Sequence, residues 1–87
     1  MTIKGAALRE VMGRRIRAAR RALDLSQGDL AAAYGKTDSW IGAIEAGRAF
    51  APPYLIWSLK TATGHSYGYF FGEGPELPTA SEQPARA

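Results

Sequence analysis

The chain lacks cysteine and has a single histidine, so it offers few side chains that hold metals or carry redox chemistry. Without cysteine there is no disulfide framework and no cysteine-type zinc site. The histidine, His65, is interpreted as a surface residue because no second ligand lies near it at a metal-binding spacing. A chain of 87 residues without disulfide bonds or metal sites must rely on packed apolar side chains for its stability, and apolar residues make up 46% of it.

Long apolar runs and catalytic constellations are also missing. No stretch approaches the roughly 20 apolar residues of a membrane span, and no apolar signal region precedes the first charged segment. The sequence shows no nucleophile with a base, no carboxylate pair and no glycine-rich phosphate loop after a strand. We therefore expect one small, soluble, cytoplasmic domain that is not an enzyme and needs no cofactor, metal or membrane.

Positive charge is concentrated at one end of the chain. Residues 1–36 hold eight Lys or Arg residues against three acids, residues 37–71 two against two, and residues 72–87 one against three. A basic end favours a polyanionic partner, although a solvated arginine face explains the charge about as well. Residues 1–7 are expected to be flexible, and residues 72–87 to form a disordered, proline-rich acidic tail.

The spacing of apolar residues predicts an all-α fold with five helices. The first, over residues 8–23, has apolar residues at intervals of three and four: Leu8, Val11 or Met12, Ile16, Ala19 and Leu23. A fourth helix is expected after the proline pair, over residues 54–62. A short fifth helix should begin after Ser66, and its aromatic residues should close the core: Tyr67, Phe70 and Phe71.

Two short helical patterns in residues 26–48 form the centre of the chain. Ser26 and Asp29 are spaced as a capping box at the start of the first pattern. Gly35, which follows that pattern, can adopt positive φ. Thr37 is placed to cap the second pattern, which Gly47 ends. Helices joined by so short a turn must cross steeply, so the second helix should project with residues 38–40 outward.

The same region carries an ordered set of motifs: Arg20, Leu25-Ser26-Gln27, Leu30-Ala31, Gly35, Ile41, Glu45-Ala46-Gly47-Arg48, and Gly64-His65-Ser66 leading to Phe70-Phe71. From about residue 16 to residue 71 the chain thereby resembles the lambdoid Cro/cI-type (XRE) helix-turn-helix family. The specificity of this resemblance lies in the order and spacing of the motifs together. It implies a compact lambda-repressor-like domain over residues 8–71 that binds double-stranded DNA.

The resemblance also assigns roles to side chains. Arg20 is expected to form a structural ion pair with Glu45, and Gln27 to bond a phosphate and brace the recognition helix. Further phosphate candidates are the basic residues Lys36, Arg48, Arg14, Arg17 and Arg21. Candidates for contact with base edges lie at the start of the recognition helix: Thr37, Asp38, Ser39, Trp40 and Ala43.

These candidates for contact with base edges include no Arg, Asn or Gln, the residues that would bind guanine or adenine through two hydrogen bonds. Two alternatives therefore stay open. One is readout dominated by phosphates and DNA shape. The other is a protein-binding adaptor or antirepressor on the same scaffold, with Trp40 as its anchor.

The principal expectation is a sequence-specific transcriptional regulator, such as a repressor, of phage or bacterial type. We expect a homodimer on an inverted-repeat operator, within the nucleoid of a bacterial or phage-infected cell. Three aromatic residues exceed the needs of a small core and are dimer candidates, with the core edge as the alternative: Tyr54, Trp57 and Tyr69.

Overall fold

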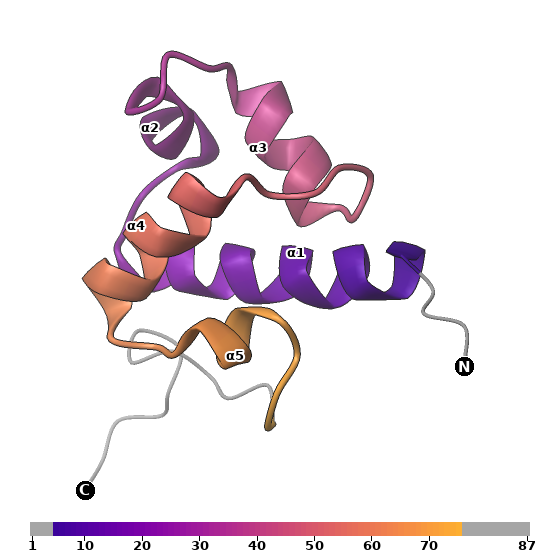
Figure 1. Cartoon of the computed structure of the whole chain (residues 1–87). Coiled ribbons are helices and arrows are strands. Elements are labelled where there is room, and N and C mark those ends of the chain that lie inside the picture. Colours follow the sequence, from indigo (N-terminus) through magenta and orange to yellow (C-terminus); the bar gives the residue numbers. More distant parts are fainter. Residues whose placement is uncertain (1–4, 76–87) are drawn as a thin grey trace, which may run out of the picture.

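The computed structural model, which describes residues 5–75, contains five helices and no strand in that range. In chain order they are α1 (Gly5–Ala22), α2 (Gln27–Ala32), α3 (Asp38–Glu45), α4 (Pro53–Thr63) and α5 (Tyr67–Phe70). The predicted all-α, five-helix class is confirmed. In Figure 1, α2 and α3 lie on one side of α1, and α5 lies on the other. Within residues 5–75, each helix is too short or too polar to span a bilayer.

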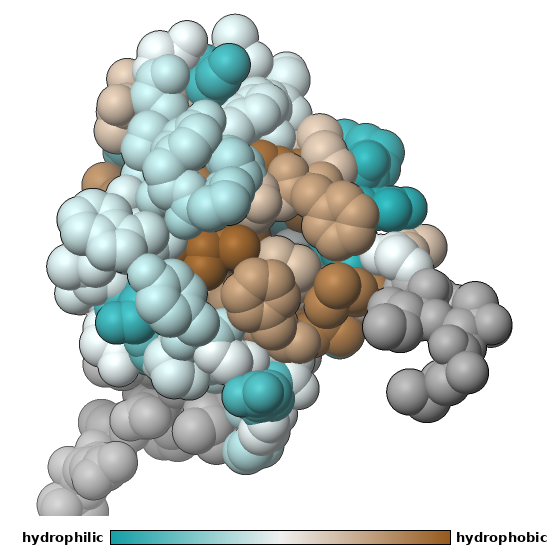
Figure 2. All heavy atoms as spheres, in the orientation of Figure 1, coloured by the Kyte–Doolittle hydropathy of each residue, from teal (hydrophilic) through white to brown (hydrophobic). Residues whose placement is uncertain are grey.

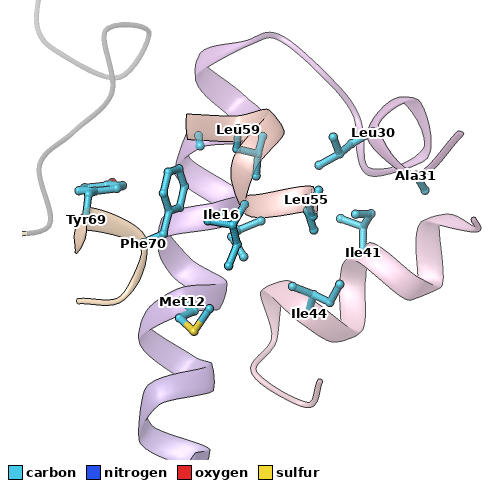
Figure 3. Close-up of a cluster of buried hydrophobic side chains, with 12 residues drawn as sticks. Met12, Ile16, Leu30, Ala31, Ile41, Ile44, Leu55, Leu59, Tyr69 and Phe70 are labelled. Carbon is cyan, nitrogen blue, oxygen red and sulfur yellow. The ribbon is translucent and has the colours of Figure 1, made fainter. Parts of the chain in front are cut away.

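The core consists of 12 buried residues, most of which Figure 3 labels: Met12, Ile16, Ala19, Leu30, Ala31, Ile41, Ile44, Leu55, Ile56, Leu59, Tyr69 and Phe70. The stripe predicted for the first helix faces this core. Phe70 is fully buried, but Tyr67 and Phe71 are about half exposed, contrary to the expectation that all three would close the core. Because Tyr69 and Phe70 are both buried, the inner side of this single turn lies between them, and residues 67 and 71, four positions apart, lie on the opposite side.

The first helix begins earlier than expected. α1 starts at Gly5, so residues 5–7, which were assigned to the flexible N-terminus, are helical. Arg9 explains the extension, since its Nε donates a hydrogen bond of 3.0 Å to the Gly47 carbonyl oxygen. Its guanidinium also lies 5.2 Å from the centre of the Phe50 ring, which holds the first turns of α1 against the loop after α3. Residues 1–4 lie outside the described residues.

The segment after α5 is tied to α1 by Arg15. The buried guanidinium of Arg15 donates from Nη1 to the carbonyl oxygens of Tyr69 (2.7 Å) and Glu73 (3.0 Å), and from Nη2 to that of Gly74 (2.8 Å). Residues 72–74 are therefore held in place, which corrects the expectation that disorder begins at residue 72. The remainder of the predicted tail, residues 76–87, lies outside the described residues.

The closest approach between α1 and α3 occurs at Gly13. A Cβ atom at this position would lie 2.5 Å from the carbonyl oxygen of Glu45 and 2.6 Å from that of Ile44. Both obstacles are backbone atoms, so neither can rotate away as a flexible side chain would. Glycine in a helix costs about 1 kcal/mol relative to alanine. Here that cost is offset by the crossing it permits.

We predict that Gly13→Ala lowers the free energy of unfolding by about 1–3 kcal/mol, because the added methyl group overpacks the crossing. The matched control is Gly28→Ala in α2, where a Cβ would meet only Ser26 Oγ at 3.8 Å. The free energy of unfolding of that control should rise by up to about 1 kcal/mol, because alanine has a higher helix propensity than glycine. Urea unfolding measures both changes. A Gly13→Ala protein with the same free energy of unfolding as the parent would contradict the close approach.

A second prediction concerns His65, which stacks on the Tyr69 ring at 3.9 Å between centroids. Partial burial, followed by the nearby charge of Arg15, lowers the pKa of His65 below its ordinary value of 6.5. The folded state thus favours the neutral imidazole. This contribution to stability should be complete above about pH 6.5 and decline as the pH falls through that value.

Thermal unfolding between about pH 7 and pH 5 tests this, with His65→Gln as the variant in which the decline should shrink. The capping carboxylate Asp29 serves as an internal reference. Its pKa is lowered from 3.8 by its hydrogen bonds with Ser26, so its contribution disappears only in a more acidic range. Identical pH dependence in parent and variant would refute the assignment to His65.

Candidate nucleic-acid interface

The helix before the turn, α2, is fixed at its start by a capping box. Ser26 Oγ accepts a hydrogen bond of 2.9 Å from the Asp29 amide, and Asp29 Oδ2 accepts one of 3.0 Å from the Ser26 amide. Each side chain thus satisfies a backbone donor that the first helical turn would leave unpaired. The predicted start of this helix is confirmed.

The turn between α2 and α3 is built around Gly35. The Lys36 amide donates to the Ala31 carbonyl oxygen (3.0 Å), and the Gly35 amide donates to that of Ala32 (3.1 Å). This pair of bonds defines a Schellman motif. The motif requires positive φ at the position of Gly35, whose φ is 66°. The motif ends α2 abruptly, so α3 can begin at Asp38 and cross α2 steeply, as predicted.

Thr37 occupies the N-cap position of α3 but plays a weaker part than expected. Its backbone is extended, as an N-cap requires, yet among the described residues its side chain makes no capping hydrogen bond. Asp38 in the first turn instead places negative charge near the positive end of the helix. The Thr37 hydroxyl is therefore exposed rather than used locally.

A buried network holds the far end of α3. Arg20 Nε donates to Glu45 Oε2 at 2.7 Å and Arg20 Nη2 to Glu45 Oε1 at 3.1 Å, while Nη1 reaches the Leu25 carbonyl oxygen at 2.7 Å. Gln27 Nε2 donates to the same Glu45 Oε1 at 3.1 Å. The end of α1, the start of α2 and the end of α3 are thus joined by one carboxylate. This is the arrangement in which the resemblance placed Arg20, Glu45 and the bracing Gln27.

The outward face of α3 presents small polar and apolar groups. Thr37, Asp38 and Ser39 are exposed, whereas Gly42 and Ala43 are half-buried. Gly42 lies beside Gln27, since a Cβ there would be 3.6 Å from Gln27 Oε1. The structure therefore brings Gln27 next to the helix face on which Asp38 and Ser39 lie one turn earlier.

Trp40 does not point outward as expected. Its indole is half-buried and packs in an aromatic cluster with Tyr34 and Tyr54, at centroid separations of 6.3 and 6.5 Å. Lys36 Nζ lies 5.8 Å from the centre of the same indole. Trp40 therefore supports the turn and the start of α4. Trp40 is therefore less accessible than its predicted roles as a base reader or as an anchor for a protein partner require.

The predicted phosphate-binding cations are all exposed. Lys36 lies in the turn before it and Arg48 directly after it. Arg14, Arg17 and Arg21 are exposed along α1. Helical spacing places Arg17 nearest to α3 among these three, because it lies four residues from Gly13 and three from Arg20, both of which contact α3.

Sequence reasoning missed the roles of Arg9 and Arg15. Arg9 lies on the same helical stripe as Gly13 and Arg20, at spacings of four and eleven, and that periodicity would have indicated a contact with α3. Arg15 lies three residues after Met12 and four before Ala19, so it interrupts the apolar stripe. A charged residue at such a position signals a buried cation with partners.

The dimer candidates separate into two groups. Tyr54 and Trp57 are 44% and 57% exposed, whereas Tyr69 is only 7% exposed and lies between His65 and the Arg15 guanidinium. Tyr69 is thus a core residue, which corrects its assignment to a dimer surface. No group of three or more potential metal ligands occurs within residues 5–75.

Comparison with protein families matches the chain to a helix-turn-helix domain over residues 11–63. The match includes α1 from Val11 onward, the turn built around Gly35 and all of α4. Comparisons with curated proteins and with solved structures gave no significant match.

We predict that Glu45→Gln and Arg20→Met each lower the free energy of unfolding by about 3–5 kcal/mol, because each leaves the other residue's charge buried and unpaired. The double variant should lose less free energy of unfolding than the two single variants lose together. The control, Gln27→Ala, removes one neutral hydrogen-bond donor and should lower the free energy of unfolding by about 1 kcal/mol. A double-mutant cycle by urea unfolding measures these terms, and strict additivity would contradict the coupling.

Proposed function

The chain belongs to the helix-turn-helix domain family, and we propose that it is a sequence-specific transcriptional regulator of the Cro/cI (XRE) type. Helix-turn-helix domains bind DNA by placing the second helix of the motif in the major groove. One observation carries the proposal: the first turn of α3 is exposed while its last turn is fixed by the Arg20–Glu45–Gln27 network. A rigid, accessible helix start is what groove readout requires.

The dimensions and chemistry of α3 suit this role. A helix with its side chains is about 10–12 Å across, which fits the major groove, about 12 Å wide. Asp38 is suited to accept a hydrogen bond from cytosine N4, and Ser39 can donate or accept. Ala43 can contact a thymine methyl group. Because these contacts are few, we propose that DNA shape adds to the specificity.

We propose that affinity comes chiefly from phosphate contacts. Lys36 and Arg48 flank the two ends of α3, and Arg17 lies beside it, with Arg14 and Arg21 further along α1. Cations at these positions would meet the backbones that border the groove and release counterions. Gln27 is engaged with Glu45, so we assign it the bracing role first and phosphate contact second.

We further propose that two copies bind an inverted repeat. A single module of this size buries a modest area on DNA, about 600–1,000 Å². Two recognition helices on one face of the duplex would bind half-sites about 34 Å apart, and their affinities would combine.

The test is selection of binding sites from random DNA by the purified protein at a stated salt concentration. The parent should enrich a palindromic motif. Asp38→Asn should shift the preference from cytosine toward adenine at one base pair, with a change of about 1–3 kcal/mol, because an amide pairs with adenine.

Lys36→Ala is the matched control in the same turn. It should weaken binding to all sequences alike and reduce the salt slope by about one, without altering the motif. Absence of any enriched motif in the parent would reject sequence-specific binding. If the Asp38→Asn variant selects the same DNA motif as the parent, Asp38 does not contact a base.

A further inference from the structure

The large hydrophobic side chains that remain exposed within residues 5–75 all gather at one site. They are Phe50 (51% exposed), Tyr54 (44%), Trp57 (57%), Tyr67 (45%) and Phe71 (48%). All of them line a groove of about 600 Å³ between the first half of α1, the loop after α3, α4 and α5. Its floor includes the buried side chains of Met12 and Ile56. Figure 2 shows brown apolar side chains on one face with paler residues around them; tyrosine and tryptophan are themselves pale on its hydropathy scale.

The aromatic groove does not overlap the proposed reading surface. Leu8 lines the groove, and Arg17 lies nine residues later on α1, which is half a turn away around the helix axis. Neither Asp38 nor Ser39 is among the lining residues. A molecule seated in the groove would therefore leave the start of α3 accessible.

We propose that a second copy of this chain fills the aromatic groove, which is thus the interface of the homodimer. The inference deepens the proposed function and rests on the chain pairing on DNA. An aromatic side chain presents about 150–250 Å², so five that are half exposed offer about 500 Å² per copy. Two copies would bury about 1,000 Å², near the lower limit for a specific interface.

By composition, a second copy offers the groove more large apolar side chains than residues 1–4 and 76–87 do. Residues 1–4 contain two large apolar residues, Met1 and Ile3, and residues 76–87 contain one, Leu77. A second copy brings five aromatic side chains and the same groove, so each surface can fill the other about a two-fold axis. Trp57, the most exposed of the five, is the side chain best placed to enter the opposite groove.

The groove is linked to the recognition helix through Arg9. The Phe50 ring in its wall lies 5.2 Å from the Arg9 guanidinium, whose Nε donates to the Gly47 carbonyl oxygen just after α3. Pairing through Phe50 would therefore fix the end of α3 in each copy. The interface would set the distance between the two recognition helices as well as hold the copies together.

The salt response of the dimer follows from the apolar lining of the groove. Within residues 5–75 no charged side chain lines it. Arg9 and Lys60 each lie about 5 Å from the centre of a ring in its wall, and the acids Glu10 and Glu73 lie beside Gly47 and Gly68 nearby. Pairing through apolar side chains should therefore change little with salt. DNA binding should weaken with salt, because counterion release drives it.

Sedimentation velocity at about 1–100 µM tests the proposal, since an interface of this size should be weak. The parent should show a concentration-dependent dimer whose dissociation constant changes little with salt. Trp57→Gln should weaken dimerisation at least tenfold, whereas Ala62→Gln, an exposed substitution on the same helix outside the groove, should leave it unchanged. Circular dichroism checks that both variants remain folded.

The outcomes separate the interface from the proposed function. On a single half-site Trp57→Gln should bind like the parent, and on the inverted repeat it should lose the gain from pairing. A parent that stays monomeric, or a Trp57→Gln protein that dimerises normally, overturns the groove assignment even if DNA binds. Dimerisation through the groove without any DNA binding would reject the proposed function and leave the interface standing.

Discussion

The buried contact between Arg20 and Glu45 determines where the recognition helix lies. Helices of six and eight residues are unstable alone, so α2 and α3 take their orientation from tertiary contacts. Two charges removed from water are tolerated only when their hydrogen bonds are complete, and here the Leu25 carbonyl oxygen and the Gln27 amide complete them. Because few placements of α3 satisfy all these partners, the pair favours one geometry rather than simply adding stability.

Features governed by near neighbours in the chain could be predicted from the sequence. The capping box of Ser26 and Asp29, the positive φ of Gly35 and the apolar stripe of α1 each depend on residues within a turn or two. The contact between Arg20 and Glu45 spans 25 residues, and only the ordered motifs of a family indicated it. Local physics therefore defined the helices, while the resemblance supplied their most important long-range contact.

Features that depend on the meeting of distant elements could not be predicted in the same way. Trp40 is covered because Tyr34 from the turn and Tyr54 from α4 converge on it, and nothing near Trp40 in the sequence specifies that meeting. Tyr69 is buried because Arg15 and His65 enclose it. Gly13 is required by the carbonyl oxygens at the end of α3. In each case the question is which side of a helix contacts which neighbour. The periodicity of apolar residues limits the possible answers but does not determine one.

The small size of the core also accounts for the aromatic groove. The core admits Phe70 and Tyr69 from α5, and because α5 is one turn long its remaining aromatic side chains stay outside beside those of α4. An exposed apolar patch of about 500 Å² lies in the size range of the largest patch on a monomer, which is often functional. Enlarging the core to cover it would need further chain, whereas the proposed pairing would cover it and would present two recognition helices together. The limited volume of the core is therefore the physical reason that the groove is left exposed.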